Sequence, residues 1–222
     1  MLQSVGVTEE GTPEIWNMFM EVNQRIRENR GWEFEIPGYP YTPVNEGQIL
    51  SYGDYDLETV GLKGHTYGQM GLYDRNHKVL FCADQVIDGI VPIVGTTYPD
   101  EHLLKGYFDS LERLKHQYGD CLILPAHKEP IRDVKRVVDR IVFAYLDKTD
   151  LIKHILDHGH HRMTTREVAC LAYGIDHVPR DQSEFIKLKM VISKTFSCLE
   201  YLYDEDFAIR TLEGGSYYWE AP

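Results

Sequence analysis

Apolar residues recur at helical spacing in five stretches of this chain. In the first, Thr12 and Pro13 precede an apolar face that stops before an Asn-Arg-Gly triplet, as suits the two ends of a helix. In the fourth, Thr164 and Glu167 have the spacing of a capping box. The third predicted helix, residues 131–156, either continues through Asp147 to Asp150 or breaks there. The periodicity predicts helices over residues 13–28, 103–118, 131–156, 165–171 and 183–203.

Short apolar runs between turn residues predict strands. The run 121–124 is apolar at every position, as expected of a strand covered on both faces, and Pro125 ends it. Near the C-terminus, two runs flank Gly214-Gly215 and predict a β-hairpin. The predicted strands cover residues 57–62, 69–73, 79–83, 121–124, 208–212 and 217–219.

These elements divide the chain into three predicted units. Residues 1–48 contain one helix and a connector whose prolines break helix and strand alike. Residues 49–160 combine strands and helices, which predicts an α/β (α+β) architecture around one sheet. Residues 161–222 follow the order helix, helix, hairpin, which is typical of a winged-helix-like domain.

Charge and cysteine usage narrow the class of protein. The net charge of −12 opposes binding to nucleic acid and to anionic membranes, and the tail from Thr164 onward has six Lys or Arg against ten Asp or Glu. No apolar run reaches the length of a membrane span, and the first residues lack the features of a secretion signal. The four cysteines are far apart, without a Cys-x-x-Cys pair. We expect a cytoplasmic protein with reduced cysteines that binds neither nucleic acid nor membrane.

Three predicted strands are followed by side chains that can bind metal. His65, Asp84 and His127 each stand in a turn of small or polar residues after such a strand. Ligand sites collect at the carboxyl ends of strands in sheet proteins. Two imidazoles and a carboxylate suit zinc, and also iron or manganese, and a carboxylate between two imidazoles can bridge two ions.

Each of these residues also has a purely structural interpretation. A histidine at a strand end is commonly a hydrogen-bonded turn residue, and an aspartate there commonly caps a turn or helix. A second histidine group follows a predicted helix end at Gly159 and is interpreted as a solvated loop that binds metal only adventitiously. Its members are His154, His158, His160 and His161.

The segments around the three candidate residues resemble the metallo-β-lactamase superfamily of metallo-hydrolases. Gly64-His65-Thr66-Tyr67-Gly68 is similar to the family's Gly-His-Thr-x-Gly element. Leu80 to Asp84 resembles the strand end with the bridging aspartate, and Leu124 to Ile131 resembles the late-histidine turn. The order and spacing fit from about Gln48 onward. The resemblance implies the second half of an αβ/βα sandwich, followed by the winged-helix-like tail that some members carry.

The resemblance also implies roles for the three residues. His65 would join two earlier histidines on a first metal ion, His127 would join an Asp-His pair on a second, and Asp84 would bind both ions as the catalytic carboxylate. The two ions, zinc in the first instance, would lower the pKa of a bridging water and polarise a carbonyl or phosphoryl oxygen.

This chain departs from the family pattern in two ways. It contains no His-x-His-x-Asp-His motif, and residues 1–48 lack the strands that would hold one. Ala83 and Ala126 stand where glycine usually precedes the ligand, and Lys63 and Lys128 replace the usual proline and glycine. One histidine and a shared aspartate per ion are fewer than the three or four ligands of a tight site.

Two functions follow as expectations. The first is a truncated metal-dependent hydrolase that attacks an ester, thioester or lactone bond of a small-molecule substrate with a metal-bound hydroxide, with weak metal occupancy and little activity alone. The second is a non-catalytic binding, scaffold or dimerisation module. In either case a half-sandwich leaves an apolar sheet face uncovered, which favours a homodimer or a complementing N-terminal half.

Overall fold

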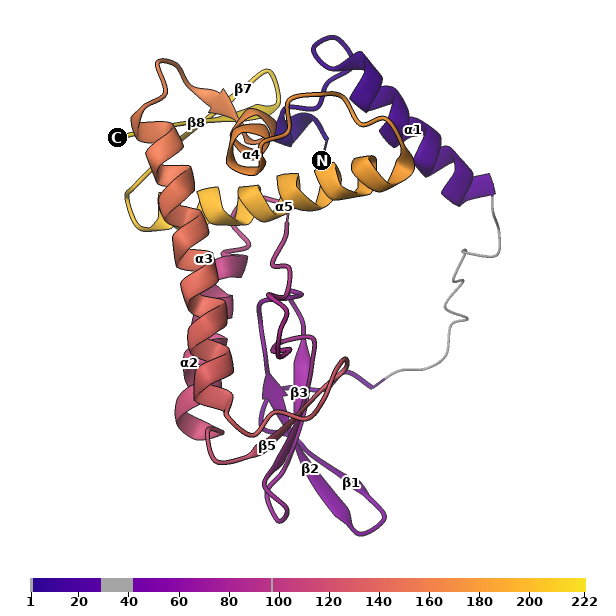
Figure 1. Ribbon diagram of the computed structural model, residues 1–222. Helices are drawn as coiled ribbons and strands as arrows, with labels where there is room; N and C mark the ends of the chain where they lie inside the picture. The colour runs from indigo at the N-terminus through magenta and orange to yellow at the C-terminus, as the bar shows by residue number, and fades with distance from the viewer. Residues whose placement is uncertain (1, 29–41, 97) are drawn as a thin grey trace.

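The computed structural model describes residues 2–28, 42–96 and 98–222. Figure 1 shows two tiers: a sheet flanked by α2 and α3, and a second tier built around α5. The elements in chain order are η1 (Gln3–Val5), α1 (Pro13–Glu28), β1 (Ile49–Tyr52), β2 (Tyr55–Gly61), β3 (Met70–Asp74), β4 (Val79–Ala83), α2 (Leu103–Gln117), β5 (Leu122–Pro125), α3 (Val134–Asp157), β6 (Met163–Thr164), α4 (Thr165–Tyr173), α5 (Gln182–Asp204), β7 (Ile209–Glu213) and β8 (Ser216–Glu220).

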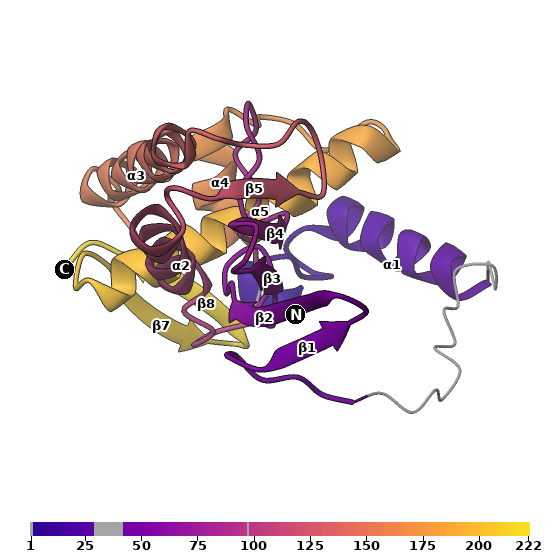
Figure 2. The ribbon, with the colours of Figure 1, turned by 90° about the horizontal axis from the view of Figure 1, so that it is seen from below.

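The larger sheet has the strand order β1-β2-β3-β4-β5. The first three pairings are antiparallel, and β4 pairs with β5 in parallel, with α2 as the crossover between them. Helices α2 and α3 pack together and lie on one side of this sheet (Figure 2). The side chains of β4 alternate between the two faces, as a strand requires. Leu80 and Cys82 are therefore buried, whereas Phe81 between them is 45% exposed on the opposite face.

The opposite face of this sheet is apolar and open to solvent in the described part of the chain. It carries a shallow groove lined by Tyr52, Tyr55, Val79, Phe81 and Leu124. Tyr52, at the end of β1, is 82% exposed. An exposed apolar area of this kind is a feature of interaction surfaces, because burying it releases ordered water.

The second tier consists of α4, α5 and a small sheet of order β6-β8-β7. Thr164 and Glu167 form the predicted capping box of α4. Trp219 of β8 is fully buried, and its indole N–H donates to Thr165 Oγ1 at 2.9 Å. The helix, helix, hairpin order matches the sequence pattern, while its interpretation as a separate winged-helix-like domain, residues 161–222, stays a prediction.

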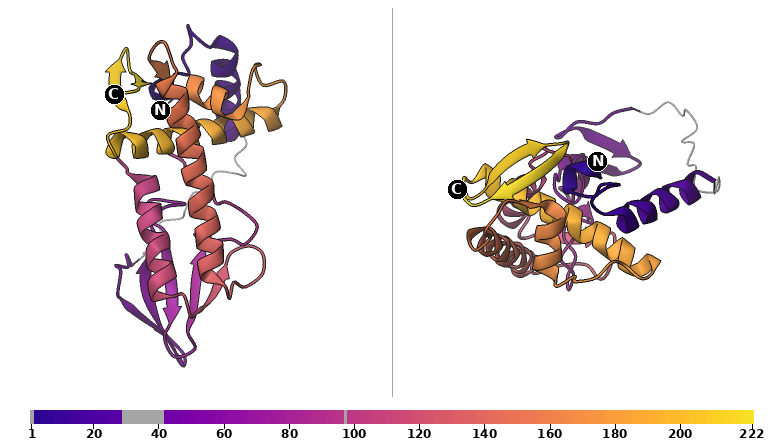
Figure 3. Two further views of the ribbon diagram at one scale, coloured as in Figure 1. Left: turned by 60° about the vertical axis from the view of Figure 1, so that its left-hand side comes forward. Right: turned by 90° about the horizontal axis from the view of Figure 1, so that it is seen from above.

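The N-terminal segment packs on this second tier and not on the larger sheet (Figures 1 and 3). Segment η1 lies against β8, and the ring of Phe19 in α1 meets that of Phe185 in α5 edge-on at 4.6 Å. The two ends of the chain are therefore neighbours in space. The proline-rich connector predicted between Pro37 and Pro43 lies largely outside the described residues.

Most predicted elements are confirmed within a few residues, helix α3 differs in detail, and the short elements η1, β1 and β6 were not predicted. Helix α3 continues through Asp147 to Asp150, where Thr149 is buried. Helix α3 also begins later than predicted, at Val134. The reason is that Ile131 pairs with Ile123 next to β5, and Asp133 caps the helix by accepting from the Arg136 backbone N–H. Strand β1 was not predicted individually, since its residues are mostly exposed and lack a buried alternation.

Two predictions from composition can be compared with the structure. All four cysteines are free, and Cys82, Cys121 and Cys198 are buried. Burial raises the pKa of the Cys82 and Cys198 thiols to about 12, so both stay protonated and unreactive. No helix in the described part of the chain combines the length and the apolar character needed to cross a bilayer.

Candidate metal centre

The strand directions bring three turns to one edge of the larger sheet. Strands β2 and β4 are both antiparallel to β3 and so run the same way, and β5 is parallel to β4. The carboxyl ends of β2, β4 and β5 therefore share an edge. Their following turns carry His65, Asp84 and His127.

These three side chains come within a few ångströms of one another. His65 Nε2 lies 3.8 Å from Asp84 Oδ2, and His127 Nε2 lies 3.6 Å from Asp84 Oδ1. Each imidazole thus faces a different oxygen of one carboxylate. His65 and Asp84 are about one-third exposed (32% and 30%), whereas His127 is 68% exposed and stands nearer to solvent.

A backbone carbonyl holds the His65 ring in one orientation. His65 Nδ1 lies 2.8 Å from the Ile93 carbonyl oxygen. Because that oxygen can only accept, Nδ1 must carry the proton, and in the neutral ring Nε2 then presents a lone pair. In a neutral ring, the atom that faces Asp84 is thus an acceptor opposite an acceptor. A carbonyl behind the ring is also the usual way in which metal-binding histidines are oriented.

Local backbone geometry explains how the turns present these residues. The backbones of Ala83 (φ 49°) and Lys128 (φ 69°) adopt left-handed conformations, which residues other than glycine rarely do. At Gly64, an added Cβ would lie 2.1 Å from the ring carbon Cδ2 of buried Tyr107. Glycine is required there, and strained residues of this kind concentrate at functional sites.

The side chains fit part of a metal site. Asp84 Oδ1 is buried and has no hydrogen-bond partner within the described residues. Its separation from the histidine nitrogens exceeds a hydrogen bond, yet two donors of one tetrahedral zinc ion lie about 3.4 Å apart, close to the observed values. In the described ranges, no three His, Cys, Asp or Glu side chains gather closely enough to hold one ion. The described residues thus bring one histidine to each oxygen of Asp84 but do not assemble three donors around one point.

The second histidine group does not converge in this way. His154 lies in the last turn of α3 and His158 caps its end, and their rings contact each other at a tilt of 39° with centroids 4.0 Å apart. His158 Nδ1 contacts the His154 carbonyl oxygen at 2.9 Å. His160 and His161 are exposed in the following loop. These contacts are those of a surface helix end.

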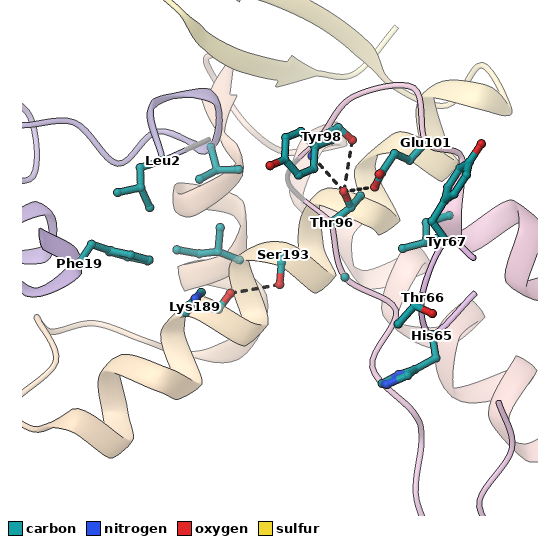
Figure 4. Close-up of a pocket in the computed structure, with 14 residues that line it drawn as sticks. Leu2, Phe19, His65, Thr66, Tyr67, Thr96, Tyr98, Glu101, Lys189 and Ser193 are labelled. Atoms are coloured by element: carbon teal, nitrogen blue, oxygen red, sulfur yellow. Dashed lines mark hydrogen bonds between the residues drawn. The ribbon is translucent and has the colours of Figure 1, made fainter. Parts of the chain in front are cut away.

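A largely apolar pocket of about 370 Å³ opens beside His65 (Figure 4). Its walls come from the N-terminal segment, from α5, from the loop that precedes α2, and from the turn at residues 65–67. Sequence reasoning did not identify this pocket or the role of Ile93. A backbone carbonyl has no residue-type signal, and walls from distant segments share no local pattern.

Two solved structures are similar to this chain over most of its length. A metallo-β-lactamase family protein from Thermus thermophilus matches 92% of this chain with a TM-score of 0.68 and 22% identity. A β-lactamase domain protein from Burkholderia ambifaria matches 90% with a TM-score of 0.72 and 17% identity. The fold is that of the metallo-β-lactamases. The predicted mixed α/β class is thereby confirmed, and the matched region covers 65% and 58% of those two metallo-β-lactamase-fold chains.

Curated proteins match only short stretches of this metallo-β-lactamase-fold chain. Acyl-coenzyme A thioesterase MBLAC2 of Gallus gallus is 42% identical over 53 residues, and that of Homo sapiens is 32% identical over 63 residues. The matched stretches are 24% and 27% of this chain, and 19% and 23% of those relatives. No family model matches the sequence.

Proposed function

We propose that this protein is a metal-dependent hydrolase of the metallo-β-lactamase superfamily that cleaves an ester, thioester or lactone bond in a small-molecule substrate. The observation that carries the proposal is the convergence of His65, Asp84 and His127 at one sheet edge, with an unpartnered Asp84 oxygen between two imidazoles. A cation can bind between a neutral imidazole nitrogen and the Asp84 oxygen that it faces, because both atoms then donate a lone pair to it.

In this proposal each residue has a defined role. Asp84, His65 and His127 would hold the metal, with each histidine binding through Nε2 and Asp84 as the carboxylate that both histidines face. Zinc is the first choice for this donor set, with iron or manganese as alternatives. A metal bound there supplies Lewis-acid polarisation of a carbonyl and activation of water. The Ile93 carbonyl keeps the proton of His65 on Nδ1, so Nε2 is free to bind.

Among the bonds considered, two observations favour a thioester with a hydrocarbon acyl group. The curated relatives with matching stretches are named acyl-coenzyme A thioesterases. The pocket beside His65 is largely apolar and so suits a hydrocarbon group next to the bond to be cleaved.

We further propose that the described residues do not complete the site. With fewer than three donors from the described residues around one point, the chain binds metal weakly and hydrolyses slowly, because a tight zinc site takes three or four protein ligands. The missing ligands come from another polypeptide segment, and the exposed face bearing Phe81 and Tyr52 is where such a segment packs.

The test measures metal and turnover together. Zinc is titrated into the metal-free protein by calorimetry, and release of thiol from dodecanoyl-coenzyme A is followed with and without zinc. We expect weak zinc binding and slow, zinc-dependent thiol release, both lost in Asp84→Asn. Release that persists in Asp84→Asn, or without metal in a chelator, contradicts the hydrolase. Two tightly held ions with rapid turnover contradict only the incompleteness of the site.

A second function is favoured by the exposed sheet face. A binding or dimerisation module would use the apolar groove that contains Tyr55, Val79 and Phe81. Sedimentation of the protein and of Phe81→Gln distinguishes the two functions. Association that depends on Phe81, combined with no zinc-dependent hydrolysis, favours the module; a monomer with hydrolysis favours the enzyme.

A further inference from the structure

The pocket beside His65 combines buried apolar residues with exposed polar ones. Val5, Phe19 and Ile192 are buried residues with side chains on its wall. Thr66 and Tyr67 line it beside His65 and are exposed, and Lys189 of α5 is exposed on the side of Phe19 (Figure 4). A cavity of this composition suits an elongated molecule with a hydrocarbon tail and a polar head.

His65 and the apolar residues of the N-terminal segment lie on different sides of the pocket. In Figure 4, Leu2 and Phe19 are on one side and His65 is on the other, with α5 between them. A tail that reaches Leu2 and Phe19 therefore leaves its head near the imidazole that faces Asp84.

The walls are tied to the folded core and to His65 itself. Phe19 is anchored edge-on against Phe185, which fixes the N-terminal wall on α5. The Thr96 backbone N–H donates to Ser197 Oγ at 3.1 Å, which fixes the loop wall on the same helix. That loop also contains Ile93, whose carbonyl orients His65. The metal-site residue His65 and the pocket wall are thus held by the same loop.

We propose that this pocket binds the unbranched aliphatic chain of an acyl substrate, with the chain end against Leu2 and Phe19 and the acyl carbonyl near His65. The orientation of the carbonyl rests on the proposed function; the binding of the chain does not. The N-terminal segment is then a specificity element, because its side chains set the longest chain that fits.

The test uses metal-free protein, so binding is separated from hydrolysis. Affinities for butyrate, octanoate, dodecanoate and hexadecanoate are measured by calorimetry below the concentrations at which these acids form micelles. We expect affinity to rise by about fourfold for each buried methylene, the equivalent of ~0.8 kcal/mol, and then to level off when the pocket is full. Affinity that does not depend on chain length overturns the proposal.

Two variants test whether the fatty acids bind in this pocket. Leu2 is half-buried, and Leu2→Trp fills the apolar end without opening the core. We expect it to lower affinity for the longest bound acid about tenfold and to leave butyrate unchanged. Phe19→Ala enlarges the same end, and the levelling point should move to a longer chain. Thermal unfolding verifies that each variant is folded.

Matched controls exclude other apolar sites. Leu171→Trp changes an exposed position outside the pocket, and Phe81→Gln removes an apolar side chain from the open sheet face. Both should bind the acids as the unchanged protein does. Loss of affinity in Phe81→Gln with full affinity in Leu2→Trp assigns the acids to the sheet face and overturns the proposal. Chain binding without any hydrolysis leaves the pocket in place and contradicts only the proposed function.

Discussion

Two groups of histidines in this chain show opposite relations between sequence and space. His65 and His127 are distant in the chain, yet both face Asp84 at 3.6–3.8 Å because three strands end at one sheet edge. His154 and His158 are four residues apart at the end of one helix, and their rings contact each other at the surface.

The difference teaches that residue density is a weak guide to a metal site. The strand-tip group contains an oriented imidazole and a buried carboxylate oxygen without a partner. The group at the end of α3 has more histidines, but His154 and His158 contact each other and His160 and His161 are exposed in the loop that follows. Convergence from several elements is what positions donors around a point, and the following predictions test how far it matters.

The largest expected effect is on zinc affinity. Asp84→Asn keeps the size of the side chain but removes its charge, and we expect zinc binding to weaken by at least about 100-fold, because losing a ligand costs no less than losing a residue that supports one. The matched double variant His160→Gln/His161→Gln should change affinity by less than about twofold. Calorimetric titration measures both. The reverse ranking would place the metal at the end of α3.

The next effect is on stability. It compares Gly64, next to His65, with Gly159, next to His158. Gly64→Ala drives a Cβ into the ring of buried Tyr107, and we expect the free energy of unfolding to fall by about 2–3 kcal/mol. Gly159→Ala meets mainly the flexible end of Met163, at 2.8 Å, and should cost less than about 1 kcal/mol. Urea unfolding measures both. Equal losses would show that the turn before His65 can adjust.

A somewhat smaller effect concerns the loop that orients His65. The Tyr145 hydroxyl accepts from the Val94 N–H at 2.8 Å and donates to the Pro92 carbonyl at 2.7 Å, on both sides of Ile93. Tyr145→Phe leaves these buried groups unpaired and should lower the free energy of unfolding by about 2 kcal/mol. Zinc affinity should fall as well. Tyr52→Phe, at an exposed position, is the control and should change neither quantity.

A small gain in stability is expected beside Asp84. Ala83 has a positive φ, so Ala83→Gly relieves strain that exceeds the entropic cost of glycine, and we expect about 0.5–1 kcal/mol of added stability. Ala126, which precedes His127, does not have a positive φ, and Ala126→Gly should instead cost about 0.5–1 kcal/mol. Chemical unfolding distinguishes the two signs. A loss in both variants would contradict strain at Ala83.

The smallest effect is the pH dependence of a histidine outside both groups. Hydrogen bonds to Asp176 and Glu184 raise the pKa of His177 above its usual value. Its contribution to stability is therefore complete below about pH 6.5 and is lost as the pH rises through the raised pKa. His177→Gln should lower the melting temperature at about pH 6 more than at about pH 8. An equal change at both values would mean that the pairing is absent in solution.

Local patterns in the sequence predicted most of the elements and their ends. The apolar periodicity of α2 and α5 and the capping box at Thr164 arise from interactions within a few residues. The apolar run 121–124 predicted strand β5 correctly, but its expected cover on both faces was wrong: β5 is the last strand of the sheet, and Leu122 and Leu124 are only half-buried. The three strand-end residues were also recognisable from their neighbours in the chain. Their role as metal ligands stays a prediction, although the geometry supports it.

Other features depend on contacts between distant segments. Helix α1 was predicted, but its place against α5 follows from the meeting of Phe19 and Phe185, which no local pattern encodes. The continuity of α3 past Asp147 to Asp150 depends on the burial of Thr149 by neighbouring elements. A polar stretch at helical spacing is ambiguous until such packing is known.

Short-range physics was enough to specify helices, strands and the residue types at the strand tips, because hydrogen bonding and side-chain alternation act between near neighbours. The distances among His65, Asp84 and His127 came from strand order and direction, and the orientation of His65 came from a carbonyl on a remote loop. The pocket likewise exists only where the N-terminal segment, α5 and that loop meet. These features are long-range, so only the folded chain contains them.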